Sequence, residues 1–405
     1  MTRPLDGIVV LDLGQIYNGP YCTLLLAYAG AEVIKIEPPG GESTRRRVRP
    51  GEESHPFLFL NGNKKSLCMD LKAPRGRELF LELVKQADVV LENFAVGTMD
   101  RLGLGVDTLL ATNPRLVIAT GKGFGTTGPY AHYPAMDLTI QAMTAVMATT
   151  GFPDQPPVKA GVAFADFIAG VHLAAGIVMA LFQRMRTGVG QVVEVAMQDA
   201  VIPTLASNLG GFFASGGTLP ERTGNRHGGL SIAPYNVYRC ADGWVAILCV
   251  SDRHWQAVAQ VIGRSDLATH PDFEGMPNRA ARMDEVDALV EQWTVTRRKQ
   301  EVVDLLLARH VPCAPVVHLA ELVDDPHVRA RGMLPTVDHP VMGPVVTFGN
   351  PIRLSAADAV PPAVAPALGQ HTEEILRQRL GLDAAAVAEL RAAGVIVTAS
   401  EGGGA

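Results

Sequence analysis

Short apolar runs alternate with amphipathic segments along the first half of the chain. The apolar runs have the length of buried strands and lie at 8–11, 32–36, 88–91, 116–120 and 191–195. Helical periodicity predicts helices at 19–28, 75–86 and 167–186, the last ended by Thr187-Gly188. Short apolar strands separated by helices are typical of a parallel sheet covered on both faces. We therefore expect a Rossmann-like α/β domain.

The pattern changes near Gly224. Strand-like runs at 235–239 and 244–250 flank Ala241-Asp242-Gly243 and predict a hairpin, and amphipathic helices are expected at 254–262, 278–293 and 298–309. Strand-like alternation returns at 334–354, and helices at 372–380 and 383–393 follow. We expect a large α/β domain over 1–205, a linker at 206–225, a smaller α+β domain at 226–325, and a return to the large domain over 326–405. The tail at 401–405 is expected to be disordered.

Composition narrows the class of protein. The chain has 405 residues, 47% of them hydrophobic and 19% charged, which predicts a folded protein. A net charge of −6 argues against a nucleic-acid partner. The 5 cysteines form no CxxC pair, and the 11 histidines show no metal-ligand spacing. The longest apolar run, 169–182, is shorter than the roughly 18 residues of a membrane span. We expect a soluble, cytoplasmic protein without a metal or membrane partner.

A match to the dinucleotide-binding motif fails in its context. Gly123-Phe-Gly125-Thr-Thr-Gly128 fits GxGxxG and follows a strand, but Pro129 and Pro134 come next, so it does not open a helix. The first strand-to-helix turn, 14–19, lacks the paired glycines that a pyrophosphate needs. We therefore expect no nicotinamide cofactor.

Two aspartates and a group of basic residues are candidates for chemistry. Asp166 precedes a long apolar helix, where it could cap the helix or act as a nucleophile or base, and Asp137 is a similar case. The basic residues cluster in the α/β part and could form a solvated surface or hold a phosphate-bearing ligand; they are Arg45, Arg46, Arg47, Arg49, Lys64, Lys65, Lys72, Arg101 and Lys122. The residue pattern leaves these alternatives open.

Segments spread over residues 4–372 together resemble the class III CoA-transferase family (CaiB/BaiF type, which includes formyl-CoA and carnitine CoA-transferases). The matching segments are 4–12, 19–20, 30–37, 63–66, 70–72, 92–94, 101–103, 187–191, 224–225, 233–235 and 369–372. Their order and spacing carry the resemblance.

The resemblance implies a covalent mechanism centred on Asp166. In the family, an aspartate before a long helix attacks an acyl-CoA and forms an aspartyl anhydride, then an aspartyl-CoA thioester. The resemblance thus implies transfer of CoA from an acyl-CoA to a carboxylic acid. Coenzyme A is then a substrate, and no cofactor is tightly bound. We take succinyl-CoA as the expected donor and a small dicarboxylate as the expected acceptor.

The resemblance also assigns binding residues. By position, the CoA contacts are Gln15, Ile16, Asn18, Met69, Lys72, Asn93, Arg101 and Lys122. Gln15 stands where relatives often have His, and Pro38 where an Arg often follows the second strand, so the adenine and phosphate contacts are weaker assignments. Candidate substrate contacts are Asp137, Arg46, Arg47, His227, Gly228 and Gly229.

Two other activities remain as alternatives, and the resemblance implies an assembly. An α-methylacyl-CoA racemase has the same fold but needs a His immediately before Asp137, where this chain has Met136. A non-catalytic CoA-binding protein is the other alternative.

The resemblance further implies an interlocked homodimer, with the active site near the domain interface and an inactive isolated monomer.

Overall fold

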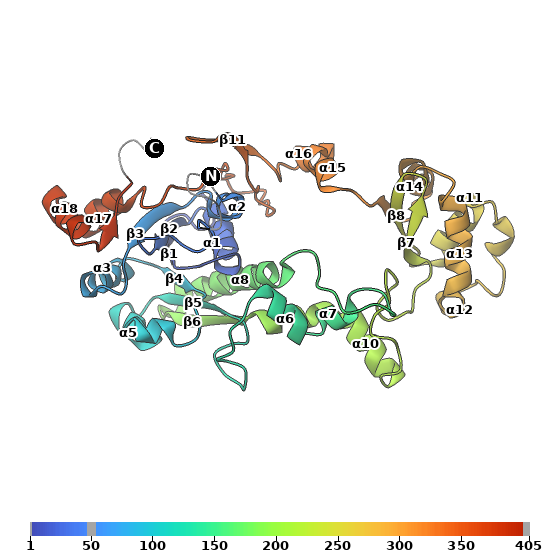
Figure 1. The fold of residues 1–405 in the computed structure, drawn as a ribbon, viewed down its shortest axis with the longest axis horizontal. Helices are drawn as coiled ribbons and strands as arrows, with labels where there is room; N and C mark the ends of the chain where they lie inside the picture. Colours follow the sequence, from blue (N-terminus) through green and yellow to red (C-terminus); the bar gives the residue numbers. More distant parts are fainter. Residues whose placement is uncertain (1, 47–53, 400–405) are drawn as a thin grey trace. The chain divides into compact units, whose positions relative to one another are not determined.

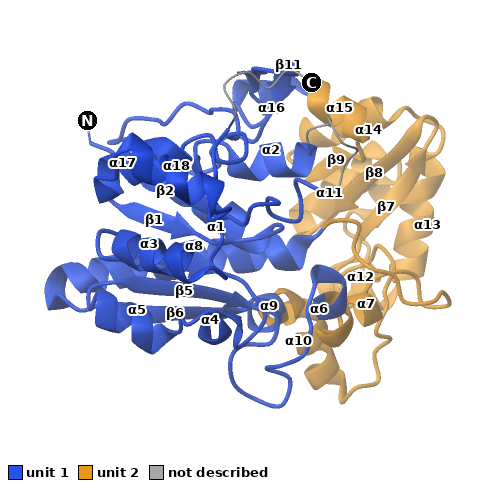
Figure 2. Ribbon diagram, turned by 60° about the vertical axis from the view of Figure 1, so that its left-hand side comes forward, with its two compact units in different colours: residues 1–140, 163–201, 325–405 blue, residues 141–162, 202–324 orange. Residues whose placement is uncertain are grey.

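The structure is a computed structural model that describes residues 2–46 and 54–399. Arg47, Arg49 and the tail at 401–405 lie outside the described residues. The chain divides into two compact units (Figure 2), each described here by itself. Unit 1 comprises residues 1–140, 163–201 and 325–405, and unit 2 comprises 141–162 and 202–324. The segment 141–162, which we expected within the large domain, groups with unit 2.

Unit 1 is built on a 7-stranded sheet with the order β12-β3-β2-β1-β4-β5-β6 (Figure 1). Its strands are β1 (Val9–Asp12), β2 (Glu32–Glu37), β3 (Lys65–Met69), β4 (Val89–Glu92), β5 (Val117–Lys122), β6 (Gln191–Ala196) and β12 (Ile396–Val397). All neighbouring pairs are parallel except β12 with β3. The order 3-2-1-4-5-6 is that of a Rossmann fold, so the predicted fold class is confirmed.

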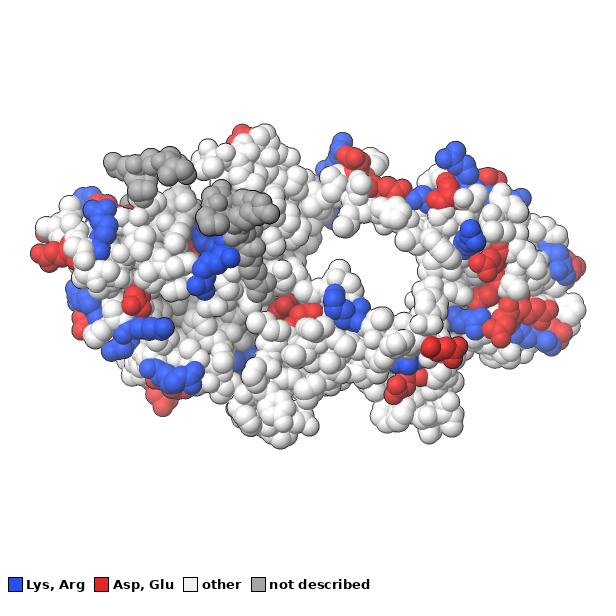
Figure 3. Space-filling model, viewed as in Figure 1, with Lys and Arg blue, Asp and Glu red and all other residues white. Residues whose placement is uncertain are grey.

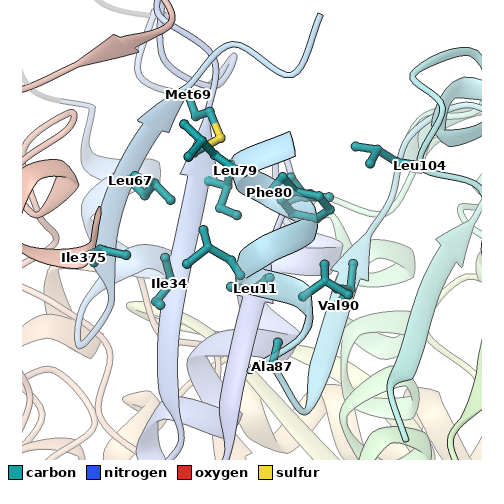
Figure 4. Close-up of a cluster of buried hydrophobic side chains, with 14 of the residues drawn as sticks. Leu11, Ile34, Leu67, Met69, Leu79, Phe80, Ala87, Val90, Leu104 and Ile375 are labelled. Atoms are coloured by element: carbon teal, nitrogen blue, oxygen red, sulfur yellow. The ribbon is translucent and has the colours of Figure 1, made fainter. Parts of the chain in front are cut away.

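The two faces of this sheet carry separate cores because successive strand residues point to opposite sides. On one face, Leu11, Ile34 and Val90 pack with side chains of α3 (Pro74–Val84), α5 (Val106–Thr112), α17 (Thr372–Leu380) and α18 (Ala384–Ala392) (Figure 4). On the other face, Val10 and Val33 pack with α1 (Asn18–Tyr28) and α8 (Phe164–Thr187). Coverage on both faces explains why the strands read as continuous apolar runs.

Helix α8 is longer than its apolar run suggested. It is a single helix of 24 residues, and among the described residues it alone has the length and composition to cross a membrane. Its inner face, which includes Leu173 and Ile177, is buried against the sheet. The outer face leaves apolar side chains exposed, among them Met179, Phe182 and Met185. The helix ends at Gly188, which has a left-handed φ of 75°, as the Thr187-Gly188 stop predicted.

Unit 2 contains a 3-stranded antiparallel sheet in the order β7-β8-β9. Strands β7 (Tyr235–Cys240) and β8 (Gly243–Leu248) form the predicted hairpin, and β9 (Cys313–Pro315) pairs with β8. Its core packs Trp255, Val286 and Leu306 around this sheet. The helices of this core are α11 (Asp252–Val261), α13 (Met283–Thr294) and α14 (Lys299–Leu307).

Some element predictions were wrong. The helix expected at 278–293 is two helices, α12 (Met276–Ala281) and α13, separated at Arg282. Helix α2 (His55–Asn61) and strands β3 and β12 were not predicted from the sequence. The remaining elements are α4 (Thr98–Arg101), α6 (Asp137–Met143), α7 (Val146–Thr149), α9 (Met197–Val201), η1 (Ile202–Leu205), α10 (Ala206–Ser215), η2 (Ser265–Leu267), α15 (Leu319–Asp324), α16 (Pro326–Ala330), β10 (Thr336–His339) and β11 (Gly343–Val346).

Candidate active site

The strand order of unit 1 creates a crevice between β1 and β4. From β1 the chain proceeds outward to β2 and β3, then returns to β4 on the other side of β1. Ligands of such sheets bind outside the carboxyl ends of the strands at this switch point. A cavity of about 310 Å³ lies there, lined by residues that directly follow β1 and β4, by the end of β5 and by the first turn of α8.

Several residues predicted from sequence meet in this cavity. Its lining includes Gln15, Ile16, Asn18, Asn93, Lys122 and Asp166. The other predicted residues of unit 1 do not line it. Met69 is buried in the core of the sheet, Lys72 is exposed before α3, and Arg101 is exposed at the end of α4, where it donates to Thr98. Arg46 is likewise exposed.

The turn between β1 and α1 is held by side chains on several backbone groups. Asp12 accepts the N–H of Gly14 at 2.7 Å, and Lys35 donates to the Gly14 carbonyl at 2.8 Å. The amide of Asn93 bonds both the N–H and the carbonyl of Gln15, at 2.8 and 2.9 Å. Ile16 has a left-handed φ of 65°, which is strained for a β-branched residue. The side chains around this turn therefore hold the cavity wall in a conformation that the turn alone would not favour.

A buried ion pair lies beneath this turn. Lys64 donates to Asp12 at 3.0 Å, to the Pro20 carbonyl at 3.0 Å and to Asn61 at 2.9 Å, and both charged side chains are fully buried. Burial lowers the pKa of Lys64 to about 8 against the attraction of Asp12. Burial alone would raise the pKa of Asp12, but Lys64 and Lys35 outweigh it and hold that pKa below its ordinary value. These groups support the turn from inside the protein.

Lys122, a predicted CoA contact, is already engaged within the protein. It donates to both carboxylate oxygens of Glu92, at 2.7 and 2.8 Å, and to the carbonyl of Phe94 at 2.6 Å. An ammonium has three N–H donors, so all of them are used. The charge of Lys122 is neutralised by Glu92, and we expect its main effect to be the placement of the chain after β4.

Asp166 and Asp137 have different positions at the start of α8. The N-cap of this helix is Ala163, and Asp166 is a half-buried side chain in its first turn. Asp137, the first residue of α6, accepts the N–H of Ala165 at 2.9 Å. An external carboxylate therefore caps the helix, and Asp166 does not occupy the N-cap position. The positive end of the helix dipole favours a negative charge at Asp166.

The glycine-rich stretch after β5 forms a wall of the cavity. A Cβ on Gly123 would lie 2.0 Å from that of Ala135, so glycine there lets the loop fold back on itself. The cavity is lined by Tyr133, Pro134, Ala135 and Met136 from this loop. No function was predicted for this stretch from the sequence, because its match to the dinucleotide motif does not open a helix. Its proline and aromatic content was the signal that it forms a structured loop.

The predicted substrate contacts His227, Gly228 and Gly229 belong to unit 2. Within that unit, a Cβ on Gly228 would lie 2.8 Å from Asn208 of α10. The N–H of Gly229 donates to the ring of His227 at 3.2 Å. Close packing on α10 thus accounts for glycine at position 228.

Figure 3 shows the charged side chains on one face of the protein. On the face shown in Figure 3, basic and acidic side chains are interspersed. Among the described residues, no group of three or more His, Cys, Asp or Glu side chains could hold a metal ion.

Comparisons with known proteins identify the family. Residues 5–372 match the profile of the family described as CoA-transferase family III. The chain belongs to CoA-transferase family III.

Its relatives include a formyl-CoA:oxalate CoA-transferase of Rhodopseudomonas palustris (strain HaA2), 39% identical with 98% of each chain covered. Another enzyme of that name, from Streptomyces coelicolor, is also 39% identical and covers 98% of this chain and 100% of its own. The crystal structure of a CaiB/BaiF family protein from Brucella suis is similar, with a TM-score of 0.81 and 36% identity. It covers 94% of this chain and 100% of its own. The predicted family and its CoA-transferase activity are confirmed.

Proposed function

We propose that Asp166 is the nucleophile with which this enzyme moves CoA from an acyl-CoA to a carboxylic acid. The observation that carries the proposal is its position. Asp166 is a half-buried carboxylate at the positive end of α8, and it lines the cavity at the switch point of the sheet. A covalent route through a carboxylate divides one difficult exchange into easier steps and needs no ATP.

The proposed reaction balances without an external acid or base. A carboxylate oxygen of Asp166 attacks the thioester carbonyl, the carbonyl π pair moves to oxygen, and collapse expels CoA as a thiolate. The thiolate then attacks the aspartyl carbonyl of the anhydride, forming a C–S bond while the donor acid leaves as a carboxylate. The acceptor carboxylate reverses both steps and restores Asp166. Each step exchanges one anion for another, and each passes through a tetrahedral oxyanion.

CoA binds, in this proposal, along the carboxyl ends of the strands of unit 1. Gln15, Ile16, Asn18 and Asn93 line the cavity that would hold the acyl end of the substrate. Lys72 and Arg101 are exposed and remain the proposed phosphate contacts, since a charge in solvent can reach a flexible diphosphate. Met69, buried in the sheet core, would act only by supporting β3.

The proposed donors are CoA thioesters of short acids, and the proposed acceptors are short carboxylic acids. The names of two relatives contain formyl-CoA and oxalate. These two compounds are therefore candidates for this chain beside succinyl-CoA as donor and a small dicarboxylate as acceptor. A dicarboxylate would bring a second carboxylate group that needs a positively charged partner. Lys122 is already paired with Glu92, and no other Lys, Arg or His is among the described residues that line the cavity. Arg46, Arg47 and His227 remain the candidate contacts for that group.

The residue at position 136 bears on the racemase alternative, and the outer face of α8 bears on the proposed homodimer. A racemase needs two bases, but position 136, immediately before Asp137, is a Met that lines the cavity and cannot take a proton.

Assembly into a homodimer is supported by the outer face of α8. There an apolar stripe leaves Val178, Met179, Phe182 and Met185 45% to 81% exposed. Continuous apolar surface of this kind is typical of protein interfaces.

The test is trapping of the covalent intermediate. Wild-type protein and Asp166→Ala are each mixed with formyl-CoA, succinyl-CoA and acetyl-CoA, with and without hydroxylamine, and intact masses are measured. We expect a CoA adduct, or a hydroxamate on Asp166, in the wild type alone. If no donor produces an adduct while CoA still binds, a proton-transfer or purely CoA-binding role replaces this proposal.

A further inference from the structure

Asn18 is a buried amide in the cavity, and the protein leaves it without a partner. It is the first residue of α1, it is 2% exposed, and it lines the same cavity as Asp166. Its Oδ1 is shut off from solvent and has no hydrogen-bond partner. The hydrogen bonds of the described chain also include none from its Nδ2. No hydrogen bond within the described chain therefore ties this amide group, and its nitrogen remains available as a donor at the cavity.

The absence of a side chain at Gly121 leaves room for the amide of Asn18. A Cβ on Gly121 would lie 2.8 Å from Oδ1 of Asn18, so the amide oxygen lies against the bare backbone of β5. Of the two polar atoms of the amide, only Oδ1 is enclosed, so Nδ2 is the atom that remains accessible from the cavity. An amide nitrogen is a hydrogen-bond donor.

The start of α1 packs directly on the first turns of α8. The ring of Phe167, the residue after Asp166, stacks on Tyr17 at 5.9 Å between centroids and meets Tyr21 edge-on at 4.9 Å. A Cβ on Gly170 would lie 2.8 Å from the Asn18 carbonyl oxygen. The backbone of Asn18 thereby packs on α8 at Gly170, one turn after Asp166.

The N-terminus of α1 adds to the positive potential around Asn18. This 11-residue helix has no acidic residue in its first turn, and its N-cap, Tyr17, makes no capping hydrogen bond through its side chain. Unpaired N–H groups at a helix N-terminus attract negative charge. The available Nδ2 donor and the N-terminus of α1 thus both favour a negatively charged ligand atom.

We propose that the amide of Asn18 is a catalytic oxyanion donor that binds the carbonyl oxygen of the acyl group during attack by Asp166. This role rests on the proposed function. When the C–O bond to Asp166 forms, the carbonyl π pair moves to oxygen, and Nδ2 of Asn18 donates a hydrogen bond to that oxyanion. When the C–S bond breaks, the carbonyl re-forms and the hydrogen bond weakens. No proton is transferred.

The test compares acylation with CoA binding in Asn18→Ala. Loss of one oxyanion donor slows the chemical step by about 10²–10³-fold. We expect acylation of Asp166, followed in single-turnover hydroxamate trapping, to slow by this factor. We expect the dissociation constant of free CoA to change by no more than about threefold, because free CoA has no thioester carbonyl.

Gly121→Ala provides a second variant that keeps Asn18 but displaces its amide. We expect it also to slow acylation. In the double variant Asn18→Ala/Gly121→Ala, we expect the second substitution to cause no slowing beyond that of Asn18→Ala alone, because no amide remains to be displaced. Gly210→Ala is the matched control, since a Cβ there meets nothing within 4 Å. Circular dichroism verifies that each variant is folded.

Three results would overturn the role. Acylation at the wild-type rate in Asn18→Ala excludes a donor. Loss of CoA affinity with an unchanged acylation rate makes Asn18 a binding contact only, and additive effects of the two substitutions break the link to Gly121. If the wild type itself forms no adduct with any donor, the proposed function fails and this role fails with it.

Discussion

Helices α1 and α8 both begin at the same cavity, but their first turns differ in chemistry. The first turn of α8 carries the carboxylate of Asp166, whereas that of α1 carries no acid and presents the amide of Asn18. Both helix ends favour negative charge. In α8 that preference is met by a resident anion, and in α1 it is left for a charge that the substrate brings. In the proposed mechanism, two similar backbone features thus support different steps of one reaction.

The two helix ends also differ in how they are held. Beneath α1, the fully buried pair of Lys64 and Asp12 ties the preceding turn to the sheet. At α8, the half-buried side chain of Asp137 accepts the N–H of Ala165. A buried charge leaves a large penalty when its partner is removed, and a partly exposed cap does not. Substitutions at the two ends should therefore differ strongly in their effect on stability.

The largest effect is expected at Asp166, the proposed nucleophile. Asp166→Asn removes the attacking carboxylate with little change in shape, so kcat should fall by about 10⁴-fold or more. The melting temperature should stay close to that of the wild type. The matched control is Asp107→Asn, an exposed aspartate in the first turn of α5. Substantial turnover by Asp166→Asn would assign the chemistry to another group.

The next largest effect, on the free energy of unfolding, is expected for the buried ion pair of Lys64 and Asp12 beneath α1. Lys64→Met leaves the Asp12 carboxylate buried without its partner, and we expect a loss of about 3–5 kcal/mol in the free energy of unfolding at neutral pH. Denaturant unfolding measures it. The exposed Lys85, paired with Glu82, is the control, and Lys85→Met should change stability by about 0.5 kcal/mol or less.

The same variant has an expected pH dependence. In the wild type, the pKa of Asp12 is below its ordinary value of 3.8, so the pair contributes stability above that pH and loses it as the pH falls. Without Lys64, burial raises the pKa of Asp12, and protonation at low pH removes the uncompensated charge. The stability difference between the two proteins should therefore narrow as the pH falls toward 4. A constant difference across this range would contradict the role of Asp12.

The next prediction concerns the outer face of α8. Burying a large apolar side chain contributes roughly 1.5–3 kcal/mol, so Phe182→Glu should weaken a dimer built on this face by that amount or more. Light scattering during size-exclusion chromatography should show a dimer for the wild type and a shift toward monomer for the variant. Val106→Glu, on the exposed surface of α5, serves as the control. A fully monomeric and active wild type would exclude the predicted assembly.

The smallest effect on stability is expected at the other helix end. Asp137→Ala removes a cap and should cost about 1 kcal/mol. It should also slow acylation, because the first turn of α8 positions Asp166. Asp383→Ala is the matched control, since Asp383 caps α18 through the N–H of Ala386. Equal loss of activity in both variants would mean that Asp137 has no specific link to the nucleophile.

The sequence predicted the regular parts of unit 1 well. Its short apolar strands and amphipathic helices lie within a few residues of their expected positions, because burial on both faces of the sheet imposes an apolar pattern. Strand β3 was missed because Lys65 and Ser66 are its first two residues and leave only a short apolar run after them. Strand β12 has only 2 residues, and its pairing with β3 comes from contacts far apart in the chain.

The candidate site was only partly predictable for a similar reason. The resemblance named Asp166, Asn18 and Asn93 by position, and the structure brings them to one cavity. The tertiary structure alone revealed that Lys122 is used by Glu92 and that Asp137 caps the helix of Asp166. Hydrogen-bond partners such as these are separated by 28 or more residues and leave no local pattern.

By itself, the sequence determined the class of fold, the family and the identity of the candidate nucleophile, because periodicity and ordered motifs are local properties of a chain. Only the tertiary structure decided which polar side chains are already paired and which face the cavity. Lys64 and Lys122 are both buried in pairs, while Asn18, equally buried, is left without a partner. That distinction depends on the distances between distant segments, which the folded protein sets.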